Sequence, residues 1–171
     1  AQVRRLERML DDLLQYGRPI DVKPEPVSFG DLMASVSTVI AEQARAKQVT
    51  IKAHDELLKA KLKVDPEHLC RALTNLVVNA IQAAPMGGVV SVRARKDALW
   101  GHSASIEVSD SGGGLSDEAK ERVFSPFFTT KESGTGLGLA NVKKIVELHG
   151  GTVTAANANG GGAVFSIKLP L

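Results

Sequence analysis

The segment EHLCRALTNLVVNAIQAA, residues 67–84, predicts the helix around which the fold is organised. It follows Asp65-Pro66, an acidic, proline-marked start that is typical of helix N-termini. Its apolar side chains recur at helical spacing and are expected to face the core: Leu69, Leu73, Leu76, Ala80 and Ala84. Its polar side chains follow at intervals of four, four and three residues on another face: Arg71, Asn75, Asn79 and Gln82.

Two asparagines, Asn75 and Asn79, lie one turn apart in the middle of this helix, where intrinsic propensity disfavours them. The asparagine side-chain oxygen is a hard, neutral ligand that suits Mg²⁺, an ion that keeps most of its waters and bridges nucleotide phosphates. The polar face of the helix is therefore either a binding site or a solvated surface.

The segments around this helix predict an α/β (α+β) two-layer sandwich. Apolar and alternating runs typical of strands occupy residues 49–53, 60–64, 89–95, 104–110, 152–156 and 163–169. Helical spacing is found at residues 28–47, 117–122 and 137–149. Strands that follow one another through short connections favour a mixed, mostly antiparallel sheet, with three helices from distant parts of the chain covering one face.

The N-terminal segment, residues 1–18, forms a separate predicted helix. Its apolar residues recur at spacings of three and four: Val3, Leu6, Leu10 and Leu13. This pattern fits either the seam of a helix that pairs with other helices or an amphipathic helix that docks on its own domain. Prolines and little periodicity make residues 19–27 the predicted linker, so the main domain is expected to span residues 28–171.

Composition limits the class of protein. A formal net charge of +2 over 171 residues describes a chain without the basic field that favours nucleic-acid binding. The single cysteine, Cys70, excludes an internal disulfide and a multi-cysteine metal site. No apolar run has the length of a membrane-spanning helix, which predicts a cytoplasmic location for this piece and leaves open whether its parent is membrane-anchored.

A carboxylate ends the predicted strand 104–110. Asp110 is in phase with Ile106 and Val108, so it continues the row of side chains that faces the core. An unpaired buried carboxylate costs several kcal/mol, and the glycines at 112–114 leave room for a flat ring to approach the backbone. An adenine amino group is a suitable donor, although Asp-Ser-Gly-Gly is also ordinary turn chemistry.

Residues 131–139, KESGTGLGL, run directly into the last predicted helix. Backbone N–H groups at such a helix start can face phosphates, but a flexible surface loop has a similar composition. The segment lacks the P-loop pattern, and the chain lacks the motifs of eukaryotic-type kinases. Ahead of it, Phe124, Phe127 and Phe128 flank Pro126, and this turn is the predicted hinge of a mobile lid.

Taken in order, these segments resemble the catalytic domain of bacterial sensor histidine kinases, within the superfamily that includes gyrase B and the mismatch-repair ATPases. The resemblance covers about residues 28–171 and implies the Bergerat ATP-binding fold. It rests on an asparagine box (NLVVNA, 75–80), a first glycine box (DSGGG, 110–114), a phenylalanine box (FSPFF, 124–128) and a second glycine box (GTGLGL, 134–139). Residues 79–85 and 126–131 look most like the nitrogen-regulation type of sensor kinase.

The resemblance implies a role for each matched residue of the pocket. Asn79 would coordinate Mg²⁺, Asn75 would help to position the phosphates or the metal, and Asp110 would bind the adenine amino group of ATP. Gly112 and Gly114 would shape the pocket. The ATP lid and the start of the following helix would comprise Gly134, Thr135, Gly136, Leu137 and Gly138.

By the same resemblance, Lys131 and Thr135 are the candidate phosphate contacts in the lid. The chain departs from the family pattern at Gln82, and the resemblance does not account for Asn141. Many family members have a basic residue three positions after the metal asparagine, where this chain has Gln82, so Lys131, Arg71 or the metal would meet the phosphate charge. Asn141 lies on the otherwise apolar side of the last helix and either contacts the lid or lies at an edge.

The chain lacks the phosphoacceptor of the family, a histidine in an H-E-x-x-x-P type motif on the first of two dimerisation helices. None of its histidines has this context: His54, His68, His102 and His149. Residues 1–18 resemble the end of the second dimerisation helix. The resemblance thus implies a protein-histidine kinase domain that transfers the γ-phosphate of ATP to a histidine on a helix absent from this chain. A response regulator aspartate would receive the phosphate next, and the full-length protein would be a homodimer.

Two other functions compete with this interpretation. An ATPase of the same superfamily needs, by resemblance, a glutamate base one turn before the metal asparagine, where this chain has Asn75. A non-catalytic nucleotide-sensing or docking domain is the second alternative. The presence of Asn79, Asp110 and the lid glycines argues against it.

Overall fold

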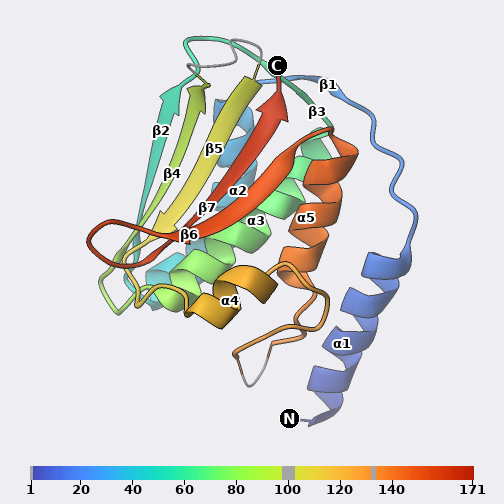
Figure 1. Ribbon diagram of the computed structural model, residues 1–171, viewed down its shortest axis with the longest axis vertical. Coiled ribbons are helices and arrows are strands. Elements are labelled where there is room, and N and C mark those ends of the chain that lie inside the picture. Colours follow the sequence, from blue (N-terminus) through green and yellow to red (C-terminus); the bar gives the residue numbers. More distant parts are fainter. Residues whose placement is uncertain (1, 98–102, 132–133) are drawn as a thin grey trace.

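A five-stranded sheet and a layer of helices pack face to face in the computed structural model, which describes residues 2–97, 103–131 and 134–171 (Figure 1). The helices are α1 (Gln2–Gly17), α2 (Phe29–Ala46), α3 (Pro66–Ala83), α4 (Asp117–Arg122) and α5 (Gly138–Leu148). The strands are β1 (Glu25–Val27), β2 (Thr50–Glu56), β3 (Leu62–Val64), β4 (Val89–Lys96), β5 (Ser103–Asp110), β6 (Thr152–Asn157) and β7 (Ala163–Pro170). The predicted two-layer α/β sandwich is confirmed.

The main sheet has the strand order β2-β4-β5-β7-β6. β2 and β4 are parallel, and every other neighbouring pair in this sheet is antiparallel. A parallel pair requires a crossover, which α3 provides between β2 and β4. Helices α2, α3 and α5 cover one face of the sheet, as predicted (Figure 1).

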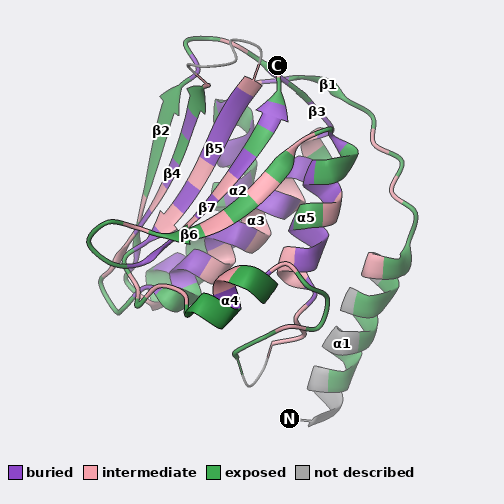
Figure 2. Ribbon diagram, viewed as in Figure 1, coloured by how far each residue is buried: buried purple, intermediate pink, exposed green. Residues whose placement is uncertain are grey.

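The core lies between these two layers, where Figure 2 shows the buried residues concentrated. The inner row of β5, Ala104, Ile106 and Val108, is fully buried. The predicted apolar stripe of α3 faces it, and Leu69, Leu73 and Leu76 are also fully buried. Each buried leucine or isoleucine contributes about 1.5–3 kcal/mol, so this apolar contact is what holds α3 against the sheet.

Side-chain caps fix where the helices begin. The Ser28 hydroxyl accepts a hydrogen bond from the Asp31 N–H at 3.1 Å and starts α2. Asp65 caps α3 in the same way, because its Oδ1 accepts from the His68 N–H at 3.0 Å and Pro66 occupies the first turn. Such caps satisfy N–H groups that have no partner inside the helix and typically contribute about 1 kcal/mol each.

The end of the predicted linker is a strand, which the sequence did not indicate. Glu25–Val27 forms β1 and pairs antiparallel with β3, and these two strands make a small separate sheet. Val27 is buried beside Leu62 and Val64, which are fully buried. A three-residue strand is too short to give a periodic signal, so only the partner strand reveals it.

Helix α1 leaves its leucine seam exposed. Leu6 is 61% exposed and Leu10 is 57% exposed, so of the two alternatives, a pairing seam and a docked amphipathic helix, the exposure of these side chains favours the seam. Its end is held by α5, because the Lys144 ammonium donates to the carbonyl oxygens of Tyr16 (2.7 Å) and Arg18 (3.1 Å). Among the described helices, α1 included, none is long and apolar enough to cross a membrane.

Candidate functional site

A cavity of about 320 Å³ opens beside the C-terminal half of α3. The end of β5, α4 and the segment that leads into α5 form its other walls. The predicted site residues that line it are Asn79, Asp110, Gly114, Lys131, Gly134, Thr135, Gly136 and Gly138. The structure therefore brings together residues from three distant segments that the sequence had singled out separately.

Asp110 lies in the wall of this cavity and is 7% exposed. Its Oδ1 accepts hydrogen bonds from the N–H groups of Gly112 (2.8 Å) and Ala163 (3.3 Å). These donors satisfy part of a carboxylate that the phase of β5 forces into the core. Both hydrogen bonds from the described residues go to Oδ1, so the second oxygen keeps its capacity to accept from a ligand amino group.

Two glycines beside Asp110 permit close backbone packing. A Cβ atom at Gly112 would lie 2.5 Å from the carbonyl oxygen of Ala83, at the end of α3. Gly162 has a φ of +85°, and a Cβ there would overlap the carbonyl oxygen of Asp110. Gly112 is not among the described residues that line the main cavity; it lines a second cavity, to which Asp110 also contributes.

Asn157, which sequence reasoning missed, fixes the loop after the first glycine box. Its Oδ1 accepts from the Leu115 N–H at 2.7 Å, and its Nδ2 donates to the Leu115 carbonyl at 2.9 Å. The adjacent Gly114 has a φ of +79°, and a Cβ there would lie 2.9 Å from the Asn157 oxygen. Nothing in the sequence links positions 115 and 157, since they are 42 residues apart.

The Lys131 ammonium reaches across the cavity to α3. It donates to the side-chain oxygen of Asn79 at 2.7 Å and also to that of Gln82. Desolvation by partial burial, with a smaller contribution from the Lys47 ammonium, lowers the pKa of Lys131. The Asn79 oxygen thus faces a position that a cation occupies.

Lys47 is a second residue that the sequence did not single out. Its ammonium donates to the main-chain carbonyls of Ile81 (3.0 Å) and Gln82 (2.6 Å). These carbonyls lie in the last turn of α3, where a cation is stabilised by unsatisfied acceptors and by the helix dipole. Lys47 therefore holds the end of the helix that carries Asn79.

Other predicted residues support the cavity without lining it. Asn75 Nδ2 donates to the Gly138 carbonyl at 3.4 Å and so joins α3 to the start of α5. Leu137 is buried at that helix start. Arg71 is not among the described residues that line the cavity. Asn141 is also absent from that lining and is buried, so the interpretation that it lies at an edge is wrong.

The phenylalanine turn is connected to the glycine-rich segment by its backbone. The Phe127 N–H donates to the Gly136 carbonyl at 2.9 Å, and a Cβ at Gly136 would overlap the Phe127 backbone. Phe127 has a φ of +65°, a backbone conformation that residues other than glycine rarely adopt. Phe128 lines the cavity, while Glu132 and Ser133 of the predicted lid lie outside the described residues.

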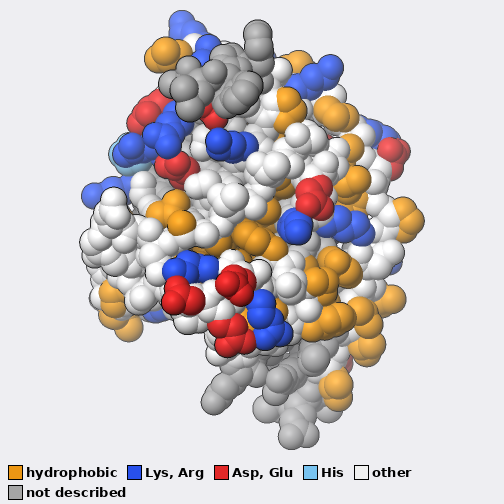
Figure 3. Space-filling model, viewed as in Figure 1, with side chains coloured by type: hydrophobic (Ala, Val, Ile, Leu, Met, Phe, Trp, Pro, Cys, Tyr) orange, Lys and Arg blue, Asp and Glu red, His pale blue; other side chains and the backbone are white. Residues whose placement is uncertain are grey.

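The charges on the nearby helix α4 are paired with one another. Lys120 contacts Asp117 at 2.6 Å and Arg122 contacts Glu118 at 2.7 Å. Figure 3 shows acidic and basic side chains intermixed on this face. The side chains of Asp117 and Glu118 are exposed, so these pairs contribute little to stability.

The profile of a protein family described as "Histidine kinase-, DNA gyrase B-, and HSP90-like ATPase" matches residues 64–171, a range that holds every cavity-lining residue named above. The chain belongs to this family. Within it, the sensor histidine kinase ZraS of Escherichia coli O157:H7 is 38% identical over 169 residues, which are 98% of this chain and 36% of that protein. The chain therefore spans about a third of the length of this curated relative.

Two solved histidine kinase structures share the fold. Full-length ShkA in complex with AMPPNP superposes with a TM-score of 0.84 at 27% identity, covering 96% of this chain and 35% of that chain. ThkA in complex with the response regulator protein TrrA superposes with a TM-score of 0.82 at 27% identity, covering 99% of this chain and 48% of that chain. The 171 residues thus contain the ATP-binding catalytic domain of a sensor histidine kinase.

The donor set of this histidine kinase domain fits a hard cation held together with a nucleotide. Among the described residues, no cluster of three or more His, Cys, Asp or Glu side chains could hold a metal by itself. Asn79 offers one neutral oxygen to the cavity, and in this structure that oxygen accepts a hydrogen bond from the Lys131 ammonium. Mg²⁺ usually takes few protein ligands and completes its shell with water and substrate phosphates, so Asn79 would hold it together with the nucleotide.

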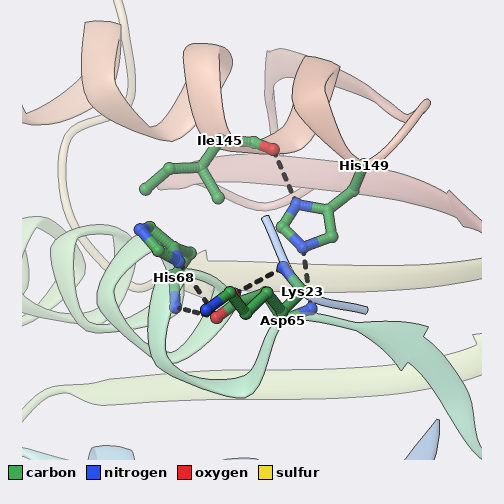
Figure 4. Close-up of polar contacts among 5 residues, drawn as sticks. All are labelled: Lys23, Asp65, His68, Ile145 and His149. Carbon is green, nitrogen blue, oxygen red and sulfur yellow. Dashed lines mark hydrogen bonds and ion pairs between the residues drawn. The ribbon is translucent and has the colours of Figure 1, made fainter. Parts of the chain in front are cut away.

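The described histidines of this domain are not placed as phosphoacceptors. Figure 4 shows His149 between two partners: its Nε2 accepts from the Asp65 N–H at 2.9 Å, and its Nδ1 lies 2.8 Å from the Ile145 carbonyl. Both ring nitrogens are thereby engaged. His68 Nδ1 is buried 3.0 Å from the Asp65 carboxylate, and His54 is exposed on β2, away from the cavity. His102 lies outside the described residues.

Proposed function

We propose that this domain transfers the γ-phosphate of ATP to a histidine on a dimerisation helix that is absent from the chain, for relay to a response regulator aspartate. The observation that carries the proposal is the shared cavity of Asp110 and Asn79, which lie on different elements and both face the same space. One offers a buried carboxylate for the adenine amino group, and the other offers a neutral oxygen for Mg²⁺.

The residues around this cavity would divide the work of positioning. Asp110 would select adenine, since a hydrogen bond to a carboxylate is worth about 1.5–3 kcal/mol. Asn79 would hold Mg²⁺, and Asn75 would keep α3 and the start of α5 in register. Lys131 and Thr135 would contact the phosphates from the segment that leads into α5.

Phosphoryl transfer to histidine needs little covalent chemistry from this domain. The γ-phosphate must be held in line with the attacking imidazole nitrogen, and its charge must be neutralised. Asn79 would hold a Mg²⁺ ion that would supply part of that neutralisation, and the Lys131 ammonium would supply another part from the opposite wall. The attacking nitrogen belongs to a neutral histidine on the other helix.

Hydrolysis is the weaker alternative because a base is missing. Of the described residues that line the cavity, Asp110 is the only carboxylate, and its Oδ1 is engaged by two N–H donors. The position one turn before Asn79 holds Asn75, which cannot accept a proton from water. An ATPase of the same superfamily therefore has weaker support than a kinase.

The exposed seam of α1 supports a parent that pairs through this helix. Of the seam residues, Leu6 and Leu10 are each more than half exposed and Leu13 is 45% exposed, although they are large apolar side chains. We assign α1 to the end of the second dimerisation helix of a homodimer. The receiver domain of a response regulator would be the downstream partner, as the ThkA structure with TrrA suggests by analogy.

Phosphoryl transfer in trans tests this function. The chain is incubated with Mg²⁺, ATP labelled on the γ-phosphate and a separate dimerisation segment that carries the H-E-x-x-x-P motif. We expect acid-labile label on the histidine of that segment, and loss of the label with Asp110→Asn. Release of inorganic phosphate at equal rates with and without the segment would instead show an ATPase.

A further inference from the structure

Gln82 stands next to Asn79 on the cavity side of α3, and both side-chain oxygens contact one ammonium. Asn79 and Gln82 are three residues apart, so they lie on the same helix face. The Lys131 ammonium donates to both oxygens, from the other side of the cavity. The hydrogen bond to Gln82 thereby helps to hold the Lys131 ammonium beside Asn79, the proposed metal ligand.

The electrostatics of this end of α3 favour a cation. The Lys47 ammonium donates hydrogen bonds to the last carbonyls of the helix. This is also the negative end of the helix dipole, which stabilises a cation. Two neutral side-chain oxygens attract Lys131 to the same region, even though Lys47 is near enough to disfavour its charge. A basic side chain at position 82 would repel Lys131 instead of accepting a hydrogen bond from it.

We propose that Gln82 is a positioning residue that holds the Lys131 ammonium on Asn79 until the metal arrives, so that Lys131 and Mg²⁺ compete for one oxygen. This inference rests on the proposed function, because it assumes that Asn79 is the metal ligand. A Mg²⁺ ion and an ammonium on the same oxygen repel each other at short range, so each one disfavours the binding of the other. Lys131 therefore leaves Asn79 when Mg²⁺ and nucleotide bind.

The competition predicts an unusual sign for a mutation in a binding site. Gln82→Met keeps the length of the side chain and its helix propensity but removes the oxygen that holds Lys131. Because the competitor is held less well, the variant needs less Mg²⁺ for nucleotide binding. Losing a hydrogen bond of about 1 kcal/mol corresponds to a decrease of about threefold to tenfold in the half-saturating Mg²⁺ concentration.

The test is a calorimetric titration of ADP at several Mg²⁺ concentrations, for the unmodified chain, Gln82→Met and Lys131→Met. Gln43→Met, an exposed glutamine on α2, is the matched control. We expect Gln82→Met to lower the half-saturating Mg²⁺ concentration at least threefold, whereas Gln43→Met should leave it unchanged. In the Lys131→Met background the same substitution should have no effect, because the competitor is already gone.

A spectroscopic signal separates positioning from a general structural effect. The side-chain amide resonances of Asn79 should shift in Gln82→Met and in Lys131→Met before nucleotide is added, and should not shift in Gln43→Met. A higher Mg²⁺ requirement in Gln82→Met would show that Gln82 is itself a ligand, and an unchanged requirement would show that it positions nothing; either result overturns the inference. Failure of the unmodified chain to bind ADP would overturn the proposed function as well.

Discussion

Helices α3 and α5 lie side by side in opposite directions, and their two ends use polar residues differently. At one end, where α3 begins and α5 finishes, Asp65 and His149 are buried and bonded to each other through the Asp65 N–H (Figure 4). At the other end, Asn79 and Asp110 face a cavity. The difference between the two ends is that Asp65 and His149 are hydrogen-bonded inside the protein, whereas Asn79 and Asp110 keep oxygens that can still accept from a ligand in the cavity.

At the closed end the Asp65 carboxylate and both ring nitrogens of His149 have partners. The buried Nδ1 of His68 has only the Asp65 carboxylate beside it, at 3.0 Å, and no hydrogen-bond partner among the described residues. The Asp65 carboxylate accepts from the N–H of Lys23 at 2.9 Å and from the N–H of His68 at 3.0 Å, so it joins the predicted linker to α3. Desolvation by burial raises the pKa of Asp65, but the hydrogen bonds from Lys23 and His68 outweigh it and lower the pKa to about 2. This end therefore contributes to stability.

The largest expected effect breaks the open end. Asp110→Asn replaces the acceptor for the adenine amino group by an amide, while its remaining oxygen can still accept from Gly112 and Ala163. We expect a ten- to hundredfold loss of ADP affinity in calorimetry, from a hydrogen bond of about 1.5–3 kcal/mol. The free energy of unfolding should change by less than about 1 kcal/mol. Equal loss in the control Asp11→Asn, an exposed residue of α1, would contradict the assignment.

The next effect breaks the closed end. His149→Phe removes the acceptor of the buried Asp65 N–H, which costs about 1–3 kcal/mol of unfolding free energy. Urea unfolding measures this loss, and His54→Phe on the exposed edge strand β2 is the matched control. ADP affinity should stay within about twofold, because His149 does not line the cavity. A larger change in affinity would mean that the two ends are coupled.

The stability that Asp65 contributes to the closed end should depend on pH in the acid range. The pKa of Asp65 is lower in the folded chain, about 2, than its ordinary value of 3.8, so its charged form stabilises the fold. The charged Asp65 contributes about 2 kcal/mol to the free energy of unfolding. This contribution is fully present at pH values well above 3.8 and is lost as the pH falls from 3.8 toward 2. Asp65→Asn keeps a good helix cap and should flatten the unfolding free energy in this pH window. An unchanged acid dependence in that variant would contradict the account.

The smallest expected effect concerns the end of α1. Lys144→Met removes the hydrogen bonds to the Tyr16 and Arg18 carbonyls, on a surface where such contacts contribute about 0.5 kcal/mol or less. Amide hydrogen exchange just after α1 should become faster, while exchange in the core strands stays the same. Lys143→Met, whose ammonium contacts only Glu147 at 3.8 Å, is the control among the described contacts. Faster exchange in the core as well would show a wider role for Lys144.

Local sequence signals predicted the orientation of three side chains at the open end, and the resemblance to histidine kinases assigned their roles. The phase of β5 predicted that Asp110 faces inward, and helical spacing predicted that Asn75 and Asn79 share a face. These are short-range properties of strands and helices, so they can be read without a partner segment. The helix start at Asp65 was visible for the same reason.

Tertiary contacts could not be predicted in this way. Lys47 meets carbonyls 34 and 35 residues further along the chain, and Asp65 meets His149 at a separation of 84 residues. Neither pair leaves a periodic pattern in the sequence, because only the folded chain brings the partners together. The pairing of β1 with β3 was missed for the same reason.

Urea unfolding with and without saturating Mg²⁺ and ADP tests the central claim most directly, because one titration reports on both ends. At a hundredfold excess over the dissociation constant, the nucleotide should raise the unfolding free energy of the unmodified chain by about 2.7 kcal/mol. Asp110→Asn, with its ten- to hundredfold weaker binding, should keep only about 0.4–1.4 kcal/mol of this increment above an unchanged baseline. His149→Phe should keep the whole increment above a lower baseline. The account would be contradicted if the unmodified chain gained no stability at millimolar nucleotide, or if folded His149→Phe lost the increment too.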